Sequence, residues 1–166
     1  MIKKILVTGA AGFLGSHATE ELVKNGYKVV VLKRSSTDMW RLNPLLQKIT
    51  IYDIDNIQLN EMFRKEEIDC VFHLAAYYKK YHVHDDIEGM IKSNLAFPTQ
   101  LIDAAANNAV KLFVNCGSYF EYKPSLFPVE ENSTRIPHNL YSASKLAFEN
   151  IIDFYTGNYG IKAIKD

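Results

Sequence analysis

Residues 28–32 (KVVVL) form a continuous valine-rich run, and this run constrains the fold more than any other feature of the chain. A strand that is apolar on both faces is typical of a parallel sheet covered by helices. Further short apolar runs lie at residues 5–7, 49–52, 70–76, 110–116 and 161–164. Stretches with helical spacing of apolar residues separate them, at 13–25, 59–67, 87–108 and 141–157. This alternation predicts an α/β fold, a doubly wound parallel sheet that binds ligands beyond the carboxyl ends of its strands.

Two prolines interrupt the regular pattern. Pro44 disfavours a helix between the second and third strands, so we expect residues 37–47 to form a loop with at most a short turn at 40–42. Pro98 lies inside the 87–108 pattern, and we expect that helix to break or bend just before it.

Charge and cysteine content exclude several classes of function. The chain has 19 Lys+Arg against 19 Asp+Glu, which argues against binding nucleic acid or anionic membranes through bulk charge. Cys70 and Cys116 lie far apart, so we expect neither a disulfide framework nor a thiolate metal site. We interpret residues 82–86 (HVHDD) as a polar loop and predict no metal site. No stretch resembles a signal peptide or a membrane span, so we expect a cytoplasmic protein with no nucleic-acid or membrane partner.

A glycine-rich turn connects the first strand to the first helix. Gly9, Gly12 and Gly15 follow a G-x-x-G-x-x-G spacing, with Phe13 and Leu14 between the last two. Glycines here permit a tight turn and a close approach of the backbone to a pyrophosphate, while the helix N-terminus offers free N–H groups. We therefore predict a dinucleotide site at this turn, against the alternative of a purely structural turn.

Residues after the second and third strands bear on the choice of nucleotide. An acidic residue after the second strand suits the ribose of NAD, whereas cations suit the 2′-phosphate of NADP. Here Lys33 and Arg34 occupy that place, which favours NADP, although two basic residues on a loop can simply be solvated. Asp53 and Ile54 follow the third strand and are expected near the adenine, while Asp53 is equally a candidate turn former.

Tyr141 and Lys145 open the last predicted helix and lie four positions apart on one face. A neighbouring ammonium favours the phenolate, so we expect Lys145 to lower the pKa of Tyr141 toward a value useful for proton transfer. Ser118 follows the fifth strand, where its hydroxyl is placed to hydrogen-bond the same substrate oxygen.

Several motifs now stand together along the chain: Thr8-Gly9-x-x-Gly12-x-x-Gly15, Asp53-Ile54, His73-Leu74-Ala75-Ala76, Asn94, Gly117-Ser118 and Tyr141-x-x-x-Lys145. In this combination the chain resembles the extended short-chain dehydrogenase/reductases, which include the NAD-dependent sugar-nucleotide epimerases, dehydratases and reductases. The stretch 32–35, with 40–42 after it, is similar to that of the CDP-linked 3,6-dideoxyhexose (abequose and paratose) synthases.

The resemblance implies a Rossmann fold and a set of site roles. Tyr141 would be the proton donor or acceptor, Lys145 its activator and a ligand of the nicotinamide ribose, and Ser118 would polarise the substrate oxygen. Asn94 would steady the long helix and water near Lys145. By the same resemblance the cofactor would contact the glycine turn with Phe13 and Leu14, the loop formed by Leu74, Ala75 and Ala76, and Lys33, Arg34, Asp53 and Ile54.

Departures from the family pattern also carry expectations. Tyr52 stands where the family usually has glycine, so we expect an altered adenine pocket. Tyr119 and Phe120 replace the Asp-Glu pair of the 4,6-dehydratases, which disfavours dehydration. We interpret residues 1–166 as an NAD(P)-binding domain and expect the family's C-terminal substrate-binding domain to lie outside this chain.

The sequence thus predicts an NADP-dependent oxidoreductase or epimerase that acts on a nucleotide-linked sugar. Two alternatives remain: an NAD-dependent sugar-nucleotide 4-epimerase and a dinucleotide-binding module without catalysis. By the same resemblance we expect a homodimer through the 87–108 and 141–157 helices, with large apolar groups supplied by Phe97, Leu101, Phe148, Ile152 and Tyr155.

Overall fold

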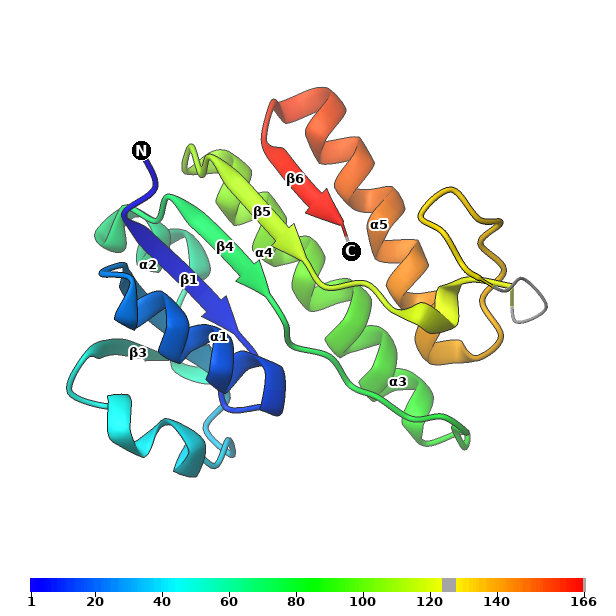
Figure 1. Ribbon diagram of the computed structural model, residues 1–166, viewed down its shortest axis with the longest axis horizontal. Coiled ribbons are helices and arrows are strands. Elements are labelled where there is room, and N and C mark those ends of the chain that lie inside the picture. The colour runs from blue at the N-terminus through cyan, green and yellow to red at the C-terminus, as the bar shows by residue number, and fades with distance from the viewer. Residues whose placement is uncertain (124–127, 166) are drawn as a thin grey trace.

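The computed structural model describes residues 1–123 and 128–165 (Figure 1). Six parallel strands form one sheet in the order β3-β2-β1-β4-β5-β6. The strands are β1 (Lys4–Thr8), β2 (Lys28–Lys33), β3 (Ile49–Asp53), β4 (Cys70–His73), β5 (Leu112–Asn115) and β6 (Lys162–Lys165). The α-helices are α1 (Phe13–Lys24), α2 (Leu59–Glu66), α3 (Asp86–Ile91), α4 (Phe97–Asn107) and α5 (Leu140–Tyr159). This is the doubly wound, Rossmann-like α/β fold that the sequence predicts.

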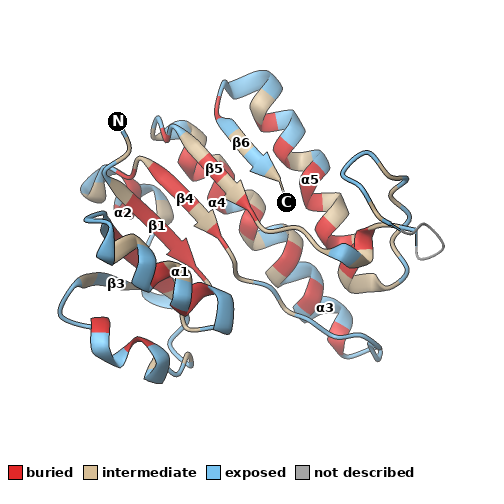
Figure 2. Ribbon diagram, viewed as in Figure 1, coloured by how far each residue is buried: buried red, intermediate tan, exposed pale blue. Residues whose placement is uncertain are grey.

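Burial explains why the central strands are so apolar. Leu6, Val7, Val30 and Val31 are all at most 1% exposed, and they pair β1 with β2 at the centre of the sheet. One core cluster joins β strands to α2, α4 and α5, and a second joins the opposite face to α1 and the 3₁₀ helix η1 (Trp40–Leu45). Figure 2 shows the buried residues concentrated along these strands and on the helix faces turned toward them. Strand order reverses between β1 and β4, so their carboxyl ends form the crevice where such sheets bind ligands.

The region around Pro44 differs from the prediction. Residues expected to form a loop contain η1, a 3₁₀ helix that includes Pro44. Leu42 and Leu45 lie three positions apart and are both buried against the second core cluster. Because a short 3₁₀ helix needs few internal hydrogen bonds, the burial of these two leucines outweighs the missing N–H of proline.

The chain stays helical from Asp86 to Asn107, but the helix geometry changes just before Pro98. A π-helical segment, η3 (Lys92–Ala96), connects α3 to α4, and proline occupies the first turn of α4. The expectation of an irregularity just before Pro98 is therefore correct, and it takes the form of a π-segment.

Strands β4 and β5 end sooner than the apolar runs 70–76 and 110–116 suggested. Gly9 turns away from the sheet with a φ of 70°, so β4 has no β1 neighbour beyond His73. The residues that follow form the loops of the candidate site instead.

Candidate active site

The glycine turn is so close at Gly9 and Gly15 that a side chain does not fit at either position. A Cβ atom on Gly9 would lie 2.6 Å from the Ala75 nitrogen, and one on Gly15 would lie 2.1 Å from the Gly9 oxygen. Gly12 is the N-cap of α1 and has no side chain to cap the free N–H groups there. Phe13 and Leu14 are 74% and 54% exposed, so the first turn of α1 faces solvent. The turn therefore fits a pyrophosphate, which needs open backbone donors at a helix N-terminus.

The loop after β4 is fastened to the end of β1. The Thr8 hydroxyl lies 2.8 Å from Nδ1 of His73 and accepts a hydrogen bond from the Ala75 N–H, while the Leu74 N–H donates to the Thr8 carbonyl. His73 is 1% exposed, and burial, with the nearby charge of Lys145, lowers its pKa to about 3. His73 is therefore a neutral, hydrogen-bonded core residue. Ala76, further along the same loop, is exposed.

Asn94 connects this loop to the last helix. Its side-chain oxygen accepts from the Tyr77 N–H, and its amide nitrogen donates to the Tyr77 carbonyl and to Oγ of Ser144. The Ser144 hydroxyl donates in turn to the carbonyl of Tyr141. Asn94 is 2% exposed, so this amide joins three backbone and side-chain partners in the interior. The structure gives Asn94 a clamping position through its hydrogen bonds to Tyr77 and Ser144, and its expected role near Lys145 stays a prediction.

The carboxyl ends of β2 and β3 lie side by side, and a charged side chain from each forms an ion pair with the other. The Lys33 ammonium is 3.5 Å from Oδ2 of Asp53 and donates to the Arg34 carbonyl. Asp53 also accepts from the Ser35 hydroxyl and from the Asp55 N–H, and the Ser35 bond is the main cause of its lowered pKa. Asp53 thus acts as a turn former, as the alternative interpretation held, while Arg34 is exposed and has no carboxylate partner in the described part of the chain. Ile54 is half-buried and packs against the core.

Tyr141 and Ser118 meet at the carboxyl edge of β5. Burial raises the pKa of Tyr141, and a hydrogen bond with the Ser118 hydroxyl partly offsets that rise. Ser118 caps the 3₁₀ helix η4 (Tyr119–Glu121) by accepting from the Phe120 N–H. Asn139 caps α5 through a capping box with Ser142, which fixes the start of the helix that carries Tyr141.

The pKa of Tyr141 is raised in the structure, whereas the sequence led us to expect a lowering by Lys145. Lys145 is 3% exposed, and burial lowers its pKa against the opposing charges of Cys116, Glu121 and Glu149. The largest contributions to the pKa of Tyr141 come from burial, Ser118, Cys116, Glu121 and Tyr78. The net direction is therefore opposite to the expected one, and the role of Lys145 as activator of Tyr141 stays a prediction.

Aromatic rings surround Tyr141 on the solvent side. The Tyr78 ring meets it edge-on at 4.9 Å and stacks with Phe120 at 6.3 Å, and Phe120 in turn meets His138 at 5.3 Å. No motif in the sequence pointed to the contribution of Phe120 and His138. Sequence reasoning also missed Glu149, although its position four residues after Lys145 on the same helix was a usable signal.

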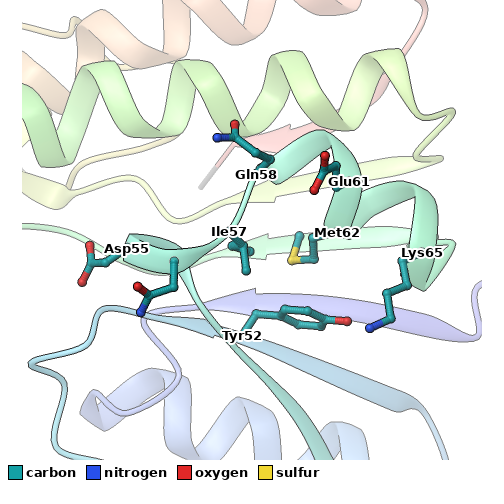
Figure 3. A pocket seen from close by; sticks show the side chains of 8 residues that line it. Tyr52, Asp55, Ile57, Gln58, Glu61, Met62 and Lys65 are labelled. Atoms are coloured by element: carbon teal, nitrogen blue, oxygen red, sulfur yellow. The ribbon is translucent and has the colours of Figure 1, made fainter.

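Tyr52 points away from this edge. Its hydroxyl donates to Oε1 of Glu66, which also pairs with Lys4 at the start of β1. The ring lines a hollow of about 480 Å³ beside α2, together with residues such as Met62 and Lys65 (Figure 3). This hollow contains none of the residues of the glycine turn, and Tyr52 occupies the α2 side of the sheet.

Asp86 explains the polar run at residues 82–86. Its carboxylate accepts from the Tyr77 hydroxyl and the Val83 N–H and pairs with Lys79 at 3.0 Å, which together lower its pKa to about 2. Within the part of the chain that the structure describes, no group of three His, Cys, Asp or Glu side chains is arranged to hold a metal ion. No helix of residues 1–123 and 128–165 is long and apolar enough to cross a membrane.

Comparison with known proteins identifies the family. The sequence profile of the NAD dependent epimerase/dehydratase family matches residues 5–165. The chain belongs to this family. Among its relatives, CDP-abequose synthase of Salmonella muenchen is 33% identical over 118 residues, covering 71% of this chain and 38% of that protein. UDP-glucose 4-epimerase of Lactobacillus helveticus is 33% identical over 164 residues, covering 96% of this chain and 49% of the relative.

A solved family member has the same fold. The crystal structure of UDP-glucuronic acid 4-epimerase from Bacillus cereus in complex with UDP-glucuronic acid and NAD superposes with a TM-score of 0.85 at 28% identity. The match covers 98% of this chain and 55% of that one. The chain thus spans about half the length of the family members it matches.

Proposed function

We propose that this chain binds a nicotinamide dinucleotide and carries the proton-transferring group of an enzyme that reduces or epimerises a nucleotide-linked sugar. One observation carries the proposal most: the glycine turn and the Ser118–Tyr141 pair lie at the same carboxyl edge of the sheet. A bound nicotinamide would donate or accept a hydride at its C4 carbon. Membership of a family whose members include sugar-nucleotide epimerases supports the substrate class.

The roles proposed for the protein groups follow from their chemistry. Tyr141 moves the proton between its hydroxyl and the sugar oxygen, because its raised pKa keeps it a protonated donor at neutral pH. Ser118 donates a hydrogen bond to the same oxygen. Lys145 supplies a buried cation next to the site, and the clamp of Asn94 holds the loop after β4 in place.

For the dinucleotide itself we propose contacts from the glycine turn with Phe13 and Leu14, and from the loop of Leu74, Ala75 and Ala76. NADP(H) is the proposed preference, since no carboxylate follows β2 directly. Lys33 is already paired with Asp53, so the preference depends mainly on Arg34. An adenine contact from Asp53 and Ile54 also belongs to this proposal.

An NAD-dependent 4-epimerase is the second candidate. The related structure in complex with NAD and the relatives named as 4-epimerases favour it. A binding module without catalysis is less well supported, because it gives no reason to bury Lys145 beside Ser118 and Tyr141.

A self-association through α3, α4 and α5 is also proposed, with a revised set of contacts. Of the residues first expected there, Leu101, Phe148 and Ile152 are 0% exposed and pack in the core, so they are unavailable to a partner. Ile87, Ile91 and Phe154 are exposed on the same helices. Light scattering at micromolar concentration is expected to show a dimer that Phe154→Glu weakens, and a wild-type monomer would contradict this.

Substitution of Tyr141 tests the proposed reaction. In a form of the protein that turns over a nucleotide sugar, Tyr141→Phe is expected to lower turnover by about 10²- to 10⁴-fold. Dinucleotide affinity should stay within a few-fold of wild type. Tyr159→Phe, on the exposed end of the same helix, is the matched control. Full turnover in Tyr141→Phe would refute the assignment.

A further inference from the structure

Two buried carboxyl groups lie behind Tyr141, and the proposed reaction does not use them. Glu121 ends η4 and is 1% exposed, while Glu149 on α5 is 4% exposed. Tyr141, Lys145 and Glu149 follow one another at spacings of four residues, so they lie along one face of α5. This face leads from the site edge into the interior.

Arg135 joins the two carboxyl groups from a third element. Its Nη1 is 3.7 Å from Oε2 of Glu121, and the same nitrogen forms an ion pair with Oε2 of Glu149. The backbone of Arg135 forms a β-bridge with Tyr122, and its guanidinium lies 5.3 Å from the centre of the Tyr122 ring. The cation is therefore held in place by contacts outside the cluster.

The cluster leaves one carboxyl oxygen without a partner. Oε1 of Glu121 is buried and has no hydrogen-bond partner among the described residues. One half-buried guanidinium cannot fully compensate two buried carboxylates, and an unpaired buried charge is costly. Burial, followed by the charge of Glu149 and a hydrogen bond with it, raises the pKa of Glu121 to about 7, while Lys145 and Arg135 oppose that rise.

We propose that Glu121 and Glu149 share one proton under the clamp of Arg135, and that Glu121 is thereby a positioning residue that biases the charge state of Lys145. With the shared proton, the four side chains of Glu121, Glu149, Arg135 and Lys145 carry one net positive charge; without it they carry none. Loss of the proton favours the Lys145 ammonium and disfavours a phenolate at Tyr141, because the Glu121 charge acts on both groups, as a thiolate at Cys116 also would. The inference rests on the proposed function only in the role that it gives to Lys145 and Tyr141.

Nuclear magnetic resonance of the ligand-free chain tests the inference directly. The Cδ signals of ¹³C-labelled glutamate are followed from acidic to alkaline pH, and Glu121 is assigned from the signal lost in Glu121→Gln. We expect one carboxyl group of the pair to titrate near neutrality, well above an ordinary glutamate. Lys145→Met should raise that midpoint, since it removes a neighbouring cation.

A second measurement follows the Nζ signal of Lys145 in the same pH titration. Glu121→Gln is expected to lower the titration midpoint of Lys145, whereas Glu131→Gln, an exposed charge removed outside the cluster, should leave it unchanged. A merely structural Glu121 would move neither midpoint. Ordinary titration of every glutamate in the wild-type chain, or a Lys145 midpoint unaffected by Glu121→Gln, would overturn the inference. Dinucleotide binding, measured separately, tests the proposed function, so the two can fail independently.

Discussion

Tyr78 meets Tyr141 edge-on, with ring centroids 4.9 Å apart and ring planes at 89°. The contact brings the loop after β4 against the first turn of α5, so residues from two distant parts of the chain enclose one phenol. Tyr141 is consequently a half-buried acid whose surroundings favour the neutral form.

Removal of the Tyr78 ring should reduce the rise in the pKa of Tyr141. Tyr78→Ala is expected to lower the pKa of Tyr141, because it exposes the phenol to water and removes a neighbouring ionisable group. Titration of the ¹³C-labelled tyrosine Cζ signals measures the shift. Tyr78→Phe, which keeps the ring, should produce a smaller change, and Tyr81→Ala, at an 81% exposed position, should produce none. Equal midpoints in all variants would show that Tyr78 does not shield Tyr141.

The pH dependence of stability should reveal two opposing groups. The folded pKa of His73 is lowered to about 3, so the unfolded chain binds the extra proton and His73 costs stability as pH falls below about 6.5. The folded pKa of Glu121 is raised to about 7, so the folded chain binds the proton and Glu121 adds stability as pH falls below 7. Between pH 7 and 5 each contributes about 2 kcal/mol with opposite sign.

We therefore expect the free energy of unfolding of the wild-type chain to change little over this range. Glu121→Gln removes the contribution that offsets His73. The free energy of unfolding of this variant should therefore fall by about 2 kcal/mol more than that of wild type between pH 7 and 5. Urea denaturation at both pH values measures the difference. If the free energy of unfolding changes equally with pH in wild type and Glu121→Gln, the pKa of Glu121 is that of an ordinary glutamate.

Asn94 should matter for stability as well as for the site. Asn94→Ala removes three buried hydrogen bonds and leaves the Tyr77 backbone groups unpaired, at a cost of about 2–4 kcal/mol in unfolding free energy. Asn107→Ala, which removes an exposed bond to Asp103, should cost less than about 0.5 kcal/mol. Denaturant unfolding of both variants checks this, and equal losses would contradict the clamp.

The fold was largely predictable because the strongest signals in the sequence are local. The valines of β2 and the turn of Gly9, Gly12 and Gly15 specify a buried parallel strand and a strand–helix connection within a few residues of one another. The 3₁₀ helix at Pro44 was not predictable in the same way, because it depends on the burial of Leu42 and Leu45 against distant elements.

The residues of the candidate site could be proposed from the sequence, but their electrostatic surroundings could not. Tyr141 and Lys145 were proposed from their spacing, Ser118 from its place after the fifth strand, and the roles of all three from the family resemblance. That Lys33 pairs with Asp53 and that Lys145 is coupled to Glu121 depends on side chains that tertiary structure brings together from separate elements. The hydrogen bonds of Asn94 could not be predicted for the same reason, since its partners lie in a loop and a helix far from it in sequence.

The choice between NADP(H) and NAD(H) should depend on Arg34 more than on Lys33. Arg34→Ala is expected to weaken NADP(H) binding about 10- to 100-fold, the loss of a charge-assisted contact, and to leave NAD(H) binding unchanged. Lys33→Ala should have a smaller effect, because Asp53 already compensates that charge. Calorimetric titration with each dinucleotide measures both. Tighter binding of NAD(H) by the wild-type chain would favour the 4-epimerase alternative.

The central claim is that the glycine turn holds a dinucleotide, and calorimetric titration of Gly12→Ala against wild type tests it most directly. A Cβ at Gly12 would lie 3.2 Å from the Gly9 oxygen, a contact that a small shift relieves, so the variant should fold while its methyl group blocks the helix N-terminus. Gly157→Ala, where a Cβ meets no atom within 4 Å, is the matched control. We predict dinucleotide binding by wild type and Gly157→Ala and at least about a tenfold loss in Gly12→Ala. Undiminished binding by folded Gly12→Ala, or no binding by the wild-type chain, would contradict the account.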